Sequence, residues 1–156
     1  MISVGGELWA ATAALAWAGL TAWSLRPRPA PAAIGEAATL VVHASQTGSA
    51  EALAEEAAAA LSAAGLTVQH LSLSQLTADL LCRAERLFLI AATTGEGDAP
   101  DEATGFLRRL MPSPPDLSHL QAGVLALGDS SYGHYCGFGR SLDSWLARAG
   151  ATALFD

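Results

Sequence analysis

The sequence predicts one doubly wound α/β domain, in which helices cover both faces of a five-stranded parallel sheet. From residue 39 onward, apolar segments of strand length alternate with segments of helical character. Such alternation favours parallel strands joined by crossover helices. At 156 residues the chain is long enough for one domain with a core and too short for two large ones.

The strand segments are recognised by their length, their apolar content and the alternation of their side chains. The first, TLVVHA, and the third, RLFLIAAT, are short apolar runs, and the third is expected to be buried. The second, LTVQHLSL, alternates and should be partly exposed on one side. The five predicted strands are residues 39–44, 66–73, 86–93, 122–129 and 151–155.

Three segments between these strands predict helices. Residues 49–65 are rich in alanine, and Gly65 is a plausible helix end. Residues 100–111 open with a proline and acidic residues and close with arginines, which suits the helix dipole. Residues 139–150 form the third helix. The sequence leaves open whether residues 74–85 form a helix or an irregular crossover.

The N-terminal segment predicts a membrane anchor. Residues 8–25 contain no charged side chain, and as a helix they would extend roughly 27 Å, about the thickness of a bilayer core. Trp9 and Trp23 lie near the two ends, where interfacial aromatic residues are enriched. The alternatives are a signal peptide, although no basic residue precedes the run, and a buried or peripheral helix, because alanine makes the run only moderately hydrophobic.

Arginines on the C-terminal side of this run set its expected orientation. Arg26 and Arg28 follow it, which favours a retained single-pass anchor in the inner (cytoplasmic) membrane, with the later domain facing the cytoplasm. The anchor is assigned to residues 1–25. Prolines and the lack of periodicity make residues 26–38 a linker.

Charge and cysteine content exclude several classes of function. The net charge is −7, from 15 acidic and 8 basic residues, which disfavours nucleic acid and suits docking to a basic protein face. Cys82 and Cys136 have no metal-ligand spacing and are expected as free thiols in a reducing compartment. The histidines also show no metal pattern; they are His43, His70, His119 and His134.

Glycine and hydroxyl residues gather after three of the predicted strands. SQTGSA follows the first strand, TTGEGDAPD the third and GDSSYGHYCGFG the fourth. Doubly wound sheets bind ligands outside the carboxyl ends of their strands, so the three loops predict one pocket.

The first of these loops predicts a phosphate site that contains no cation. It opens a helix, whose first amides lack internal partners and whose dipole favours an anion. Gly48 allows a tight turn, and Ser45, Thr47 and Ser49 can each donate a hydrogen bond. The alternative is an ordinary helix cap, for which one hydroxyl would be enough.

Other phosphate-binding motifs fit the sequence poorly. There is no G-x-x-x-x-G-K-[ST] motif of nucleoside triphosphatases. GEGDAP has Pro100 where a dinucleotide fingerprint needs its third glycine, and it follows the third strand rather than the first. The first strand ends in His43 and Ala44, without the acidic residues of a phospho-acceptor domain.

Taken together, SQTGSAE, ATTGEGDAPDEA and LGDSSYGHYCGFGRSLD resemble the three flavin loops of the FMN-binding flavodoxin-like domain of the diflavin reductases. That family includes sulfite reductase flavoproteins, cytochrome reductases and nitric oxide synthase reductases. The resemblance covers residues 39–156 and implies the strand order 2-1-3-4-5. It also implies a domain that is C-terminally incomplete, because the family continues into a last helix, missing here, and then into regions for FAD and NADPH.

The resemblance assigns cofactor-binding roles to the residues of the three loops. Ser45, Gln46, Thr47, Gly48, Ser49 and Ala50 would surround the FMN phosphate; Ala92, Thr93, Thr94 and Gly95 would line one side of the isoalloxazine ring; and Leu127, Gly128, Asp129, Ser130, Ser131, Tyr132, Gly133, His134, Tyr135 and Cys136 would line the other.

Two of these residues have a physical basis for their role. Tyr132 offers a flat aromatic ring to a flat heterocycle, although a core tyrosine is the alternative. Gly95 can flip its peptide without steric cost, and its carbonyl would then accept a hydrogen bond from flavin N5 in the one-electron state. Cys136 is expected to pack in its loop, since no base or resolving cysteine stands beside it.

The implied function is an electron-transfer module of an NADPH-dependent diflavin reductase, in which FMN passes single electrons from FAD to a haem or iron–sulfur acceptor. Thr94 stands where cytochrome reductases carry an aromatic residue, and the third loop matches the sulfite reductase flavoproteins better. The alternatives are a stand-alone short-chain flavodoxin and an anchored non-catalytic binding module that has lost its flavin.

Four acidic residues near the second loop suggest where the acceptor docks. Glu96, Asp98, Asp101 and Glu102 would form an acidic rim around the exposed flavin edge and steer a weak encounter. Asp101 and Glu102 are equally explained by the preference of acidic residues for the start of a helix.

Overall fold

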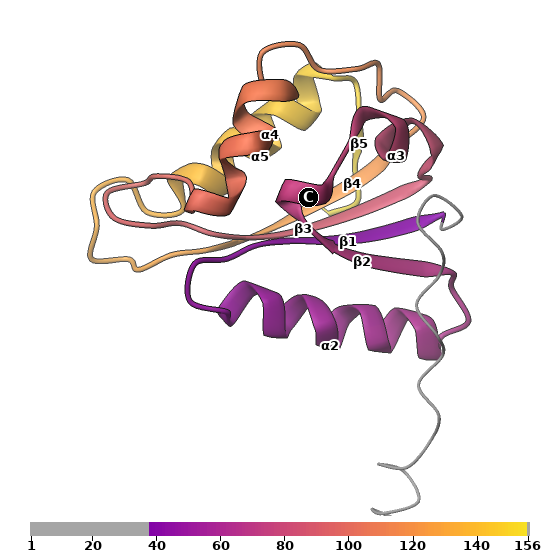
Figure 1. Ribbon diagram of the computed structural model, residues 1–156, viewed down its shortest axis with the longest axis horizontal. Helices are drawn as coiled ribbons and strands as arrows, with labels where there is room; N and C mark the ends of the chain where they lie inside the picture. The colour runs from indigo at the N-terminus through magenta and orange to yellow at the C-terminus, as the bar shows by residue number, and fades with distance from the viewer. Residues whose placement is uncertain (1–37, 156) are drawn as a thin grey trace, which may run out of the picture.

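The computed structural model describes residues 38–155 as a five-stranded parallel sheet in the order β2-β1-β3-β4-β5 (Figure 1). The predicted doubly wound fold and its strand order are confirmed. The strands are β1 (Thr39–Ala44), β2 (Val68–Ser72), β3 (Arg86–Ala92), β4 (Gln121–Leu127) and β5 (Thr152–Ala153). β5 is shorter than predicted, although Leu154 N–H still donates to the Ala122 carbonyl oxygen at 2.8 Å.

Helix α2 (Ser49–Ala63) covers one face of the sheet, and the other helices cover the opposite face (Figure 1). These are α3 (Ala78–Arg83), α4 (Thr104–Arg109) and α5 (Gly137–Arg148), with short 3₁₀ turns η1 (Leu73–Gln75) and η2 (Asp101–Ala103). Gly65 follows the end of α2 with a φ of +90°, so the predicted glycine stop is confirmed.

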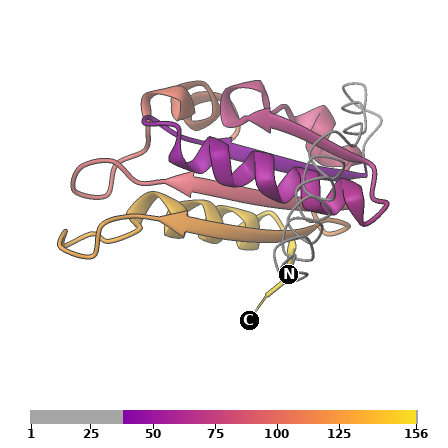
Figure 2. The same cartoon turned by 90° about the horizontal axis from the view of Figure 1, so that it is seen from below.

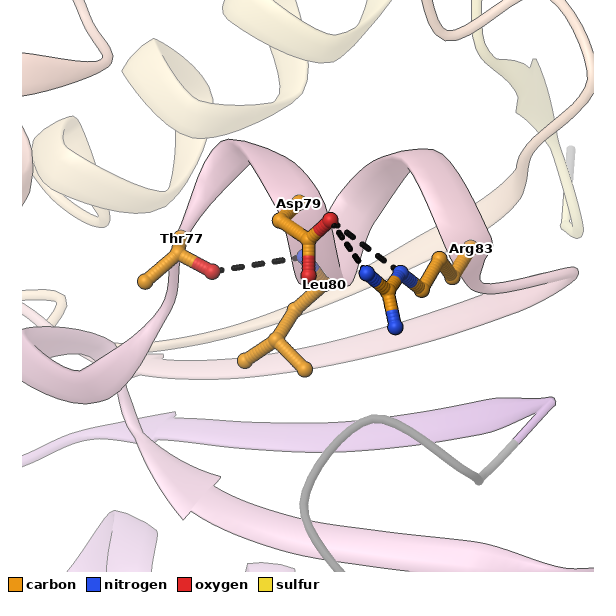
Figure 3. Close-up of polar contacts among 4 residues, drawn as sticks. All are labelled: Thr77, Asp79, Leu80 and Arg83. Atoms are coloured by element: carbon orange, nitrogen blue, oxygen red, sulfur yellow. Dashed lines mark hydrogen bonds and ion pairs between the residues drawn. The ribbon is translucent and has the colours of Figure 1, made fainter.

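The segment that the sequence left open, residues 74–85, contains a helix of fewer than two turns. Local side chains stabilise it at both ends (Figure 3). The Thr77 hydroxyl accepts a hydrogen bond from Leu80 N–H at 3.3 Å, and Arg83 binds Asp79 Oδ1 through Nη2 at 2.8 Å. Leu80 and Leu81 are buried, so packing against the sheet accounts for a helix too short to be stable alone.

The face under α3, α4 and α5 holds the main core. Trp145 and Phe106 are fully buried there, with their rings edge to face and centroids 5.0 Å apart. Trp145 Nε1–H donates to the Leu110 carbonyl oxygen at 3.1 Å, so the indole is packed and its one donor is satisfied. Leu40 and Val42 of β1 contribute to the same core.

The face that carries α2 is less completely covered. Its buried cluster is small and lies under the helix, and it includes Val41, Ile90 and Ala54. On the side of β4 the sheet has no helix over it in the described part of the chain, as Figure 2 shows from below. Leu125 is 50% exposed and Phe155 is 67% exposed.

The predicted anchor and nearly all of the linker, residues 1–37, lie outside the described residues. Within residues 38–155, no helix is long and apolar enough to span a bilayer.

Candidate functional site

The loops after β1, β3 and β4 lie at the same edge of the sheet, because the three strands are parallel neighbours (Figure 2). Thr93 N–H donates to the Leu127 carbonyl oxygen at 2.8 Å, which joins the starts of the second and third loops. The predicted convergence of the glycine and hydroxyl residues on one edge is therefore confirmed.

The loop after β1 forms a tight turn at the start of α2. Ser45 Oγ accepts a hydrogen bond from Gly48 N–H at 2.9 Å, and Gly48 has a left-handed φ of 87°. Thr47 Oγ1 and Ser49 Oγ lie 3.4 Å apart in an exposed position. Gly48 is the N-cap and no side chain caps the helix, so the hydroxyls do not serve as ordinary caps. The first amides of α2 and two exposed hydroxyls are thus available to an anion.

A small cavity lies between the second and third loops. Its volume of about 40 Å³ gives room for about three water molecules. A three-ring heterocycle would therefore have to lie across its mouth rather than inside it. The cavity is lined by Thr93, Gly95, Gly128, Asp129, Tyr132, His134, Tyr135 and Cys136.

The hydroxyl of Thr93 is buried and has no hydrogen-bond partner within the described residues. It lies at the end of β3, where Thr93 lines the cavity. A buried hydroxyl without a partner costs free energy. Its oxygen is not accessible to water, so a ligand in the cavity would reach it only after the Thr93 side chain rotated. The cavity with its two tyrosines and the exposed hydroxyls of the first loop lie at one edge of the sheet, which fits a ligand that has both a flat ring system and a phosphate.

The second loop is a compact turn that packs against the third. Thr94 and Asp98 form an isolated antiparallel bridge, with Asp98 N–H 2.8 Å from the Thr94 carbonyl oxygen. Gly95 has a φ of +49°. Gly97 has a φ of +124°, and a Cβ there would lie 2.7 Å from His134 Cβ, so glycine is required for this approach of the two loops.

The third loop presents two aromatic side chains at the cavity mouth. Tyr132 is 44% exposed and Tyr135 is 41% exposed, so neither is the core tyrosine that was the alternative for Tyr132. Asp129 Oδ1 accepts the Ser131 N–H at 2.9 Å, and this hydrogen bond lowers the pKa of Asp129. A hydrogen bond with the Cys136 thiol raises the pKa of Tyr135.

Cys136 is a buried packing residue, as predicted. Its Sγ–H donates to the Ala126 carbonyl oxygen at 3.5 Å. Its φ of 54° is the only positive value for a residue other than glycine among residues 38–155. The backbone therefore turns sharply at this point to start α5.

The structure divides the predicted site residues into two groups. Those that line the cavity come from the second and third loops, while the first loop, residues 45–50, lies outside it at the same edge. The remaining members of the second and third loops do not line the cavity; they are Ala92, Thr94, Leu127, Ser130, Ser131 and Gly133. The role of each residue toward a cofactor stays a prediction.

Two contacts of the site edge could not be read from the sequence. Ser45 N–H donates to Glu102 Oε1 at 2.7 Å, across 57 positions of chain. Glu102 is half-buried and so differs from the exposed Glu96, Asp98 and Asp101, with which the sequence grouped it in one rim.

The second contact joins two histidines. His43 Nδ1 and His70 Nε2 lie 2.8 Å apart beside α2. Within residues 38–155, no three histidines, cysteines or acidic residues are placed to hold a metal ion.

Residues 41–156 match the flavodoxin family. This chain belongs to that family. The chain is 36% identical to the sulfite reductase [NADPH] flavoprotein alpha-component of Vibrio parahaemolyticus, over 91% of this chain and 25% of the relative. It is 40% identical to the same component of Neisseria meningitidis serogroup C (strain 053442), over 74% of this chain and 19% of the relative.

Solved structures of flavodoxins share the fold. A cysteine-to-alanine mutant of flavodoxin from Pseudomonas aeruginosa superposes with a TM-score of 0.67 at 30% identity, over 75% of this chain and 79% of that one. A short-chain flavodoxin associated with a PDU bacterial microcompartment gives 0.66 at 30% identity, over 76% and 79%. The predicted resemblance to the flavodoxin-like domain of the diflavin reductases is confirmed, although the chain spans about a quarter of the length of the first sulfite reductase relative.

Proposed function

We propose that this flavodoxin domain binds FMN and passes single electrons between a reductase and an acceptor. The observation that carries the proposal is the placement of the Thr93 cavity and the hydroxyl loop on one edge of the sheet. The cavity offers two exposed aromatic side chains, Tyr132 and Tyr135, and the loop offers donors without a cation. FMN combines the two matching groups in one molecule.

The first loop would hold the phosphate. Its donors are the hydroxyls of Thr47 and Ser49 and the first amides of α2, whose dipole favours a negative charge. Ser45 Oγ accepts the Gly48 N–H, which keeps the turn closed, and its O–H can still donate to a ligand. Dipoles and hydroxyls neutralise the phosphate in this arrangement, so no lysine or arginine is needed.

The second and third loops would hold the ring. Tyr132 is 44% exposed, so its ring is available for stacking. Gly95 already has a left-handed φ, which leaves its peptide free to change orientation at little cost. Bound FMN supplies the redox chemistry, and the protein sets its orientation, its access to water and its potential.

The relatives suggest the wider system. Their name, sulfite reductase [NADPH] flavoprotein alpha-component, supports an NADPH-dependent oxidoreductase. We further propose, from the resemblance to the diflavin reductases, that an FAD-containing unit reduces the FMN and that a haem or iron–sulfur protein receives the electrons. Glu96, Asp98 and Asp101 are exposed near the second loop and would steer a basic acceptor by charge. We further propose that residues 8–25 anchor the domain to the inner membrane, on its cytoplasmic side.

A stand-alone flavodoxin carrier, reduced by a separate enzyme, is the second candidate. It is supported by the fold that the chain shares with solved flavodoxins, with a TM-score of 0.67 at 30% identity for the Pseudomonas aeruginosa protein. Both candidates share the FMN site and differ in the source of electrons.

Stepwise reduction of the FMN-loaded chain tests the proposal. The full 156-residue chain, purified in mild detergent and freed of excess FMN, is titrated anaerobically with dithionite. Bleaching in two separable one-electron steps is expected for a carrier of single electrons. Retained flavin that bleaches in one two-electron step would contradict single-electron transfer while leaving FMN binding intact.

A further inference from the structure

One hydrogen bond joins the first loop to the segment that follows the second. Ser45 N–H donates to Glu102 Oε1 at 2.7 Å, a length typical of a bond to a carboxylate. Ser45 is the first residue after β1, and Glu102 lies in η2 beyond the turn of Thr94 and Asp98. The contact therefore connects the predicted phosphate subsite to the element next to the predicted ring subsite.

The backbone of Glu102 is fixed on both sides. Pro100 is buried and precedes η2, and its carbonyl oxygen accepts the Ala103 N–H at 2.9 Å. Ala103 is fully buried in the main core. Because the carboxylate extends from a rigid element, it can determine where the first loop lies.

The same bond has an electrostatic cost. It places a negative charge beside a loop that would receive a phosphate dianion, and like charges repel. It also occupies the amide of Ser45, which then cannot donate to the ligand. A carboxylate at this point would oppose phosphate binding unless its contribution to the position of the loop outweighs the repulsion.

We propose that Glu102 is a positioning residue that holds the phosphate loop in register with the ring loops, and that it is not part of the partner-docking rim. Ser45 Oγ in turn accepts Gly48 N–H, so the position of Ser45 sets the turn that precedes α2. Glu102 acts through Ser45 on the phosphate subsite and leaves the ring subsite unchanged. This inference rests on the proposed FMN function.

Affinities for FMN and for riboflavin, which lacks the phosphate, test the inference in the full chain in mild detergent. Glu102→Ala removes the acceptor and is expected to weaken FMN about tenfold, the loss of one hydrogen bond to a charged group. Riboflavin should change less than about twofold, because the ring subsite is intact. Glu102→Gln keeps an acceptor and removes the charge, so it should restore FMN affinity to the original value or above.

Asp101 provides a matched control, since it is the neighbouring exposed carboxylate in η2. Asp101→Ala makes the same change of charge and should leave both affinities within about twofold. An equal loss of affinity for FMN and for riboflavin in Glu102→Ala would overturn the inference, because it would indicate a general loss of structure. Tighter FMN binding in both Glu102 variants would also overturn it. That result would mean that the Glu102 carboxylate only repels the phosphate and does not help to position the loop. An original chain that binds neither flavin would overturn the proposed function itself.

Discussion

The two faces of the sheet differ in how completely helices cover them. One face is well packed, and part of the other is exposed. Within the described residues, the face under α3, α4 and α5 has a cluster of 23 buried residues, and the face under α2 has a cluster of five. Leu125 and Phe155 remain exposed on the second face, beside β4. Substitutions should therefore be costly on the first face and mild on the part of the second face that α2 does not cover, beside β4.

This contrast also bears on the site. Phe138, near the start of α5, and Ala103 of η2 are buried in the large cluster, so the elements that flank the second and third loops are fixed by it. The first loop instead precedes α2 and belongs to the weaker face. The contact between Ser45 and Glu102 ties this loop to the better packed side.

The largest expected effect is on the face under α3, α4 and α5. Trp145→Ala would lose fully buried ring area, its contact with Phe106 and a satisfied indole hydrogen bond, and should cost about 3–5 kcal/mol of unfolding free energy. Phe155→Ala, the counterpart on the other face, should cost less than about 1 kcal/mol, because the ring is mostly exposed. Urea unfolding measures both, and equal costs would refute the contrast.

Two glycines, one on each face, allow the faces to be tested with the same added methyl group. A Cβ at Gly139 of α5 would lie 2.3 Å from Ala126 Cβ, and neither group can move away, so Gly139→Ala should cost about 1–3 kcal/mol. At Gly123 of β4 the nearest atom belongs to the exposed Phe155 ring, 2.7 Å away, which can rotate. Gly123→Ala should stay within about 0.5 kcal/mol. Thermal unfolding of the pair would contradict this account if Gly123→Ala were the worse.

A histidine pair makes the α2 face sensitive to pH. Burial, and then the neighbouring His43, lower the pKa of His70, while Glu55 and Glu51 oppose the shift. The unfolded chain therefore holds more protons than the folded one just below the ordinary histidine pKa of about 6.5. This contribution to the unfolding free energy is complete above the ordinary histidine pKa. It is lost as the pH falls from there through the lower pKa that His70 has in the folded chain.

Replacing His70 isolates this effect. His70→Gln should flatten the dependence of unfolding free energy on pH below about 6.5, as measured by urea unfolding at several pH values. His119→Gln is the control, since it lies away from the pair and binds the Leu81 carbonyl oxygen. If the unsubstituted chain became more stable as the pH fell through this range, the pKa of His70 would not be lowered by folding.

The smallest effect is expected where the sheet is open. Leu125 is half exposed, so Leu125→Gln should change the unfolding free energy by about 0.5 kcal/mol or less. Leu89→Gln, at a buried position of β3 on the opposite face, should instead be strongly destabilising, because it buries an amide. Comparable losses in the two variants would show that Leu125 is covered in solution.

The sequence was sufficient for the strands and for the convergence of the loops, because both follow from local patterns. Gly65 and Pro100 marked the ends of elements correctly, and glycine and hydroxyl residues marked the ligand edge. The contacts of Glu102 with Ser45 and of His43 with His70 could not be predicted in this way. Each joins positions that are distant in sequence and that only the strand register and the side-chain rotamers bring together.

The exposure of Leu125 was also beyond local reasoning. Apolar alternation makes β4 a strand, but whether one of its faces is covered depends on a helix elsewhere in the fold. The two-residue length of β5 was also not predicted; this strand pairs with β4 alone at one edge of the sheet. Edge strands have only one neighbour to extend their ladder.

FMN binding is tested by the absorption spectrum of the full chain, recorded after addition of FMN and removal of the excess by gel filtration. We expect about one flavin retained per chain, with its fluorescence quenched by stacking on Tyr132. A colourless protein with the circular dichroism of an intact α/β fold would contradict it.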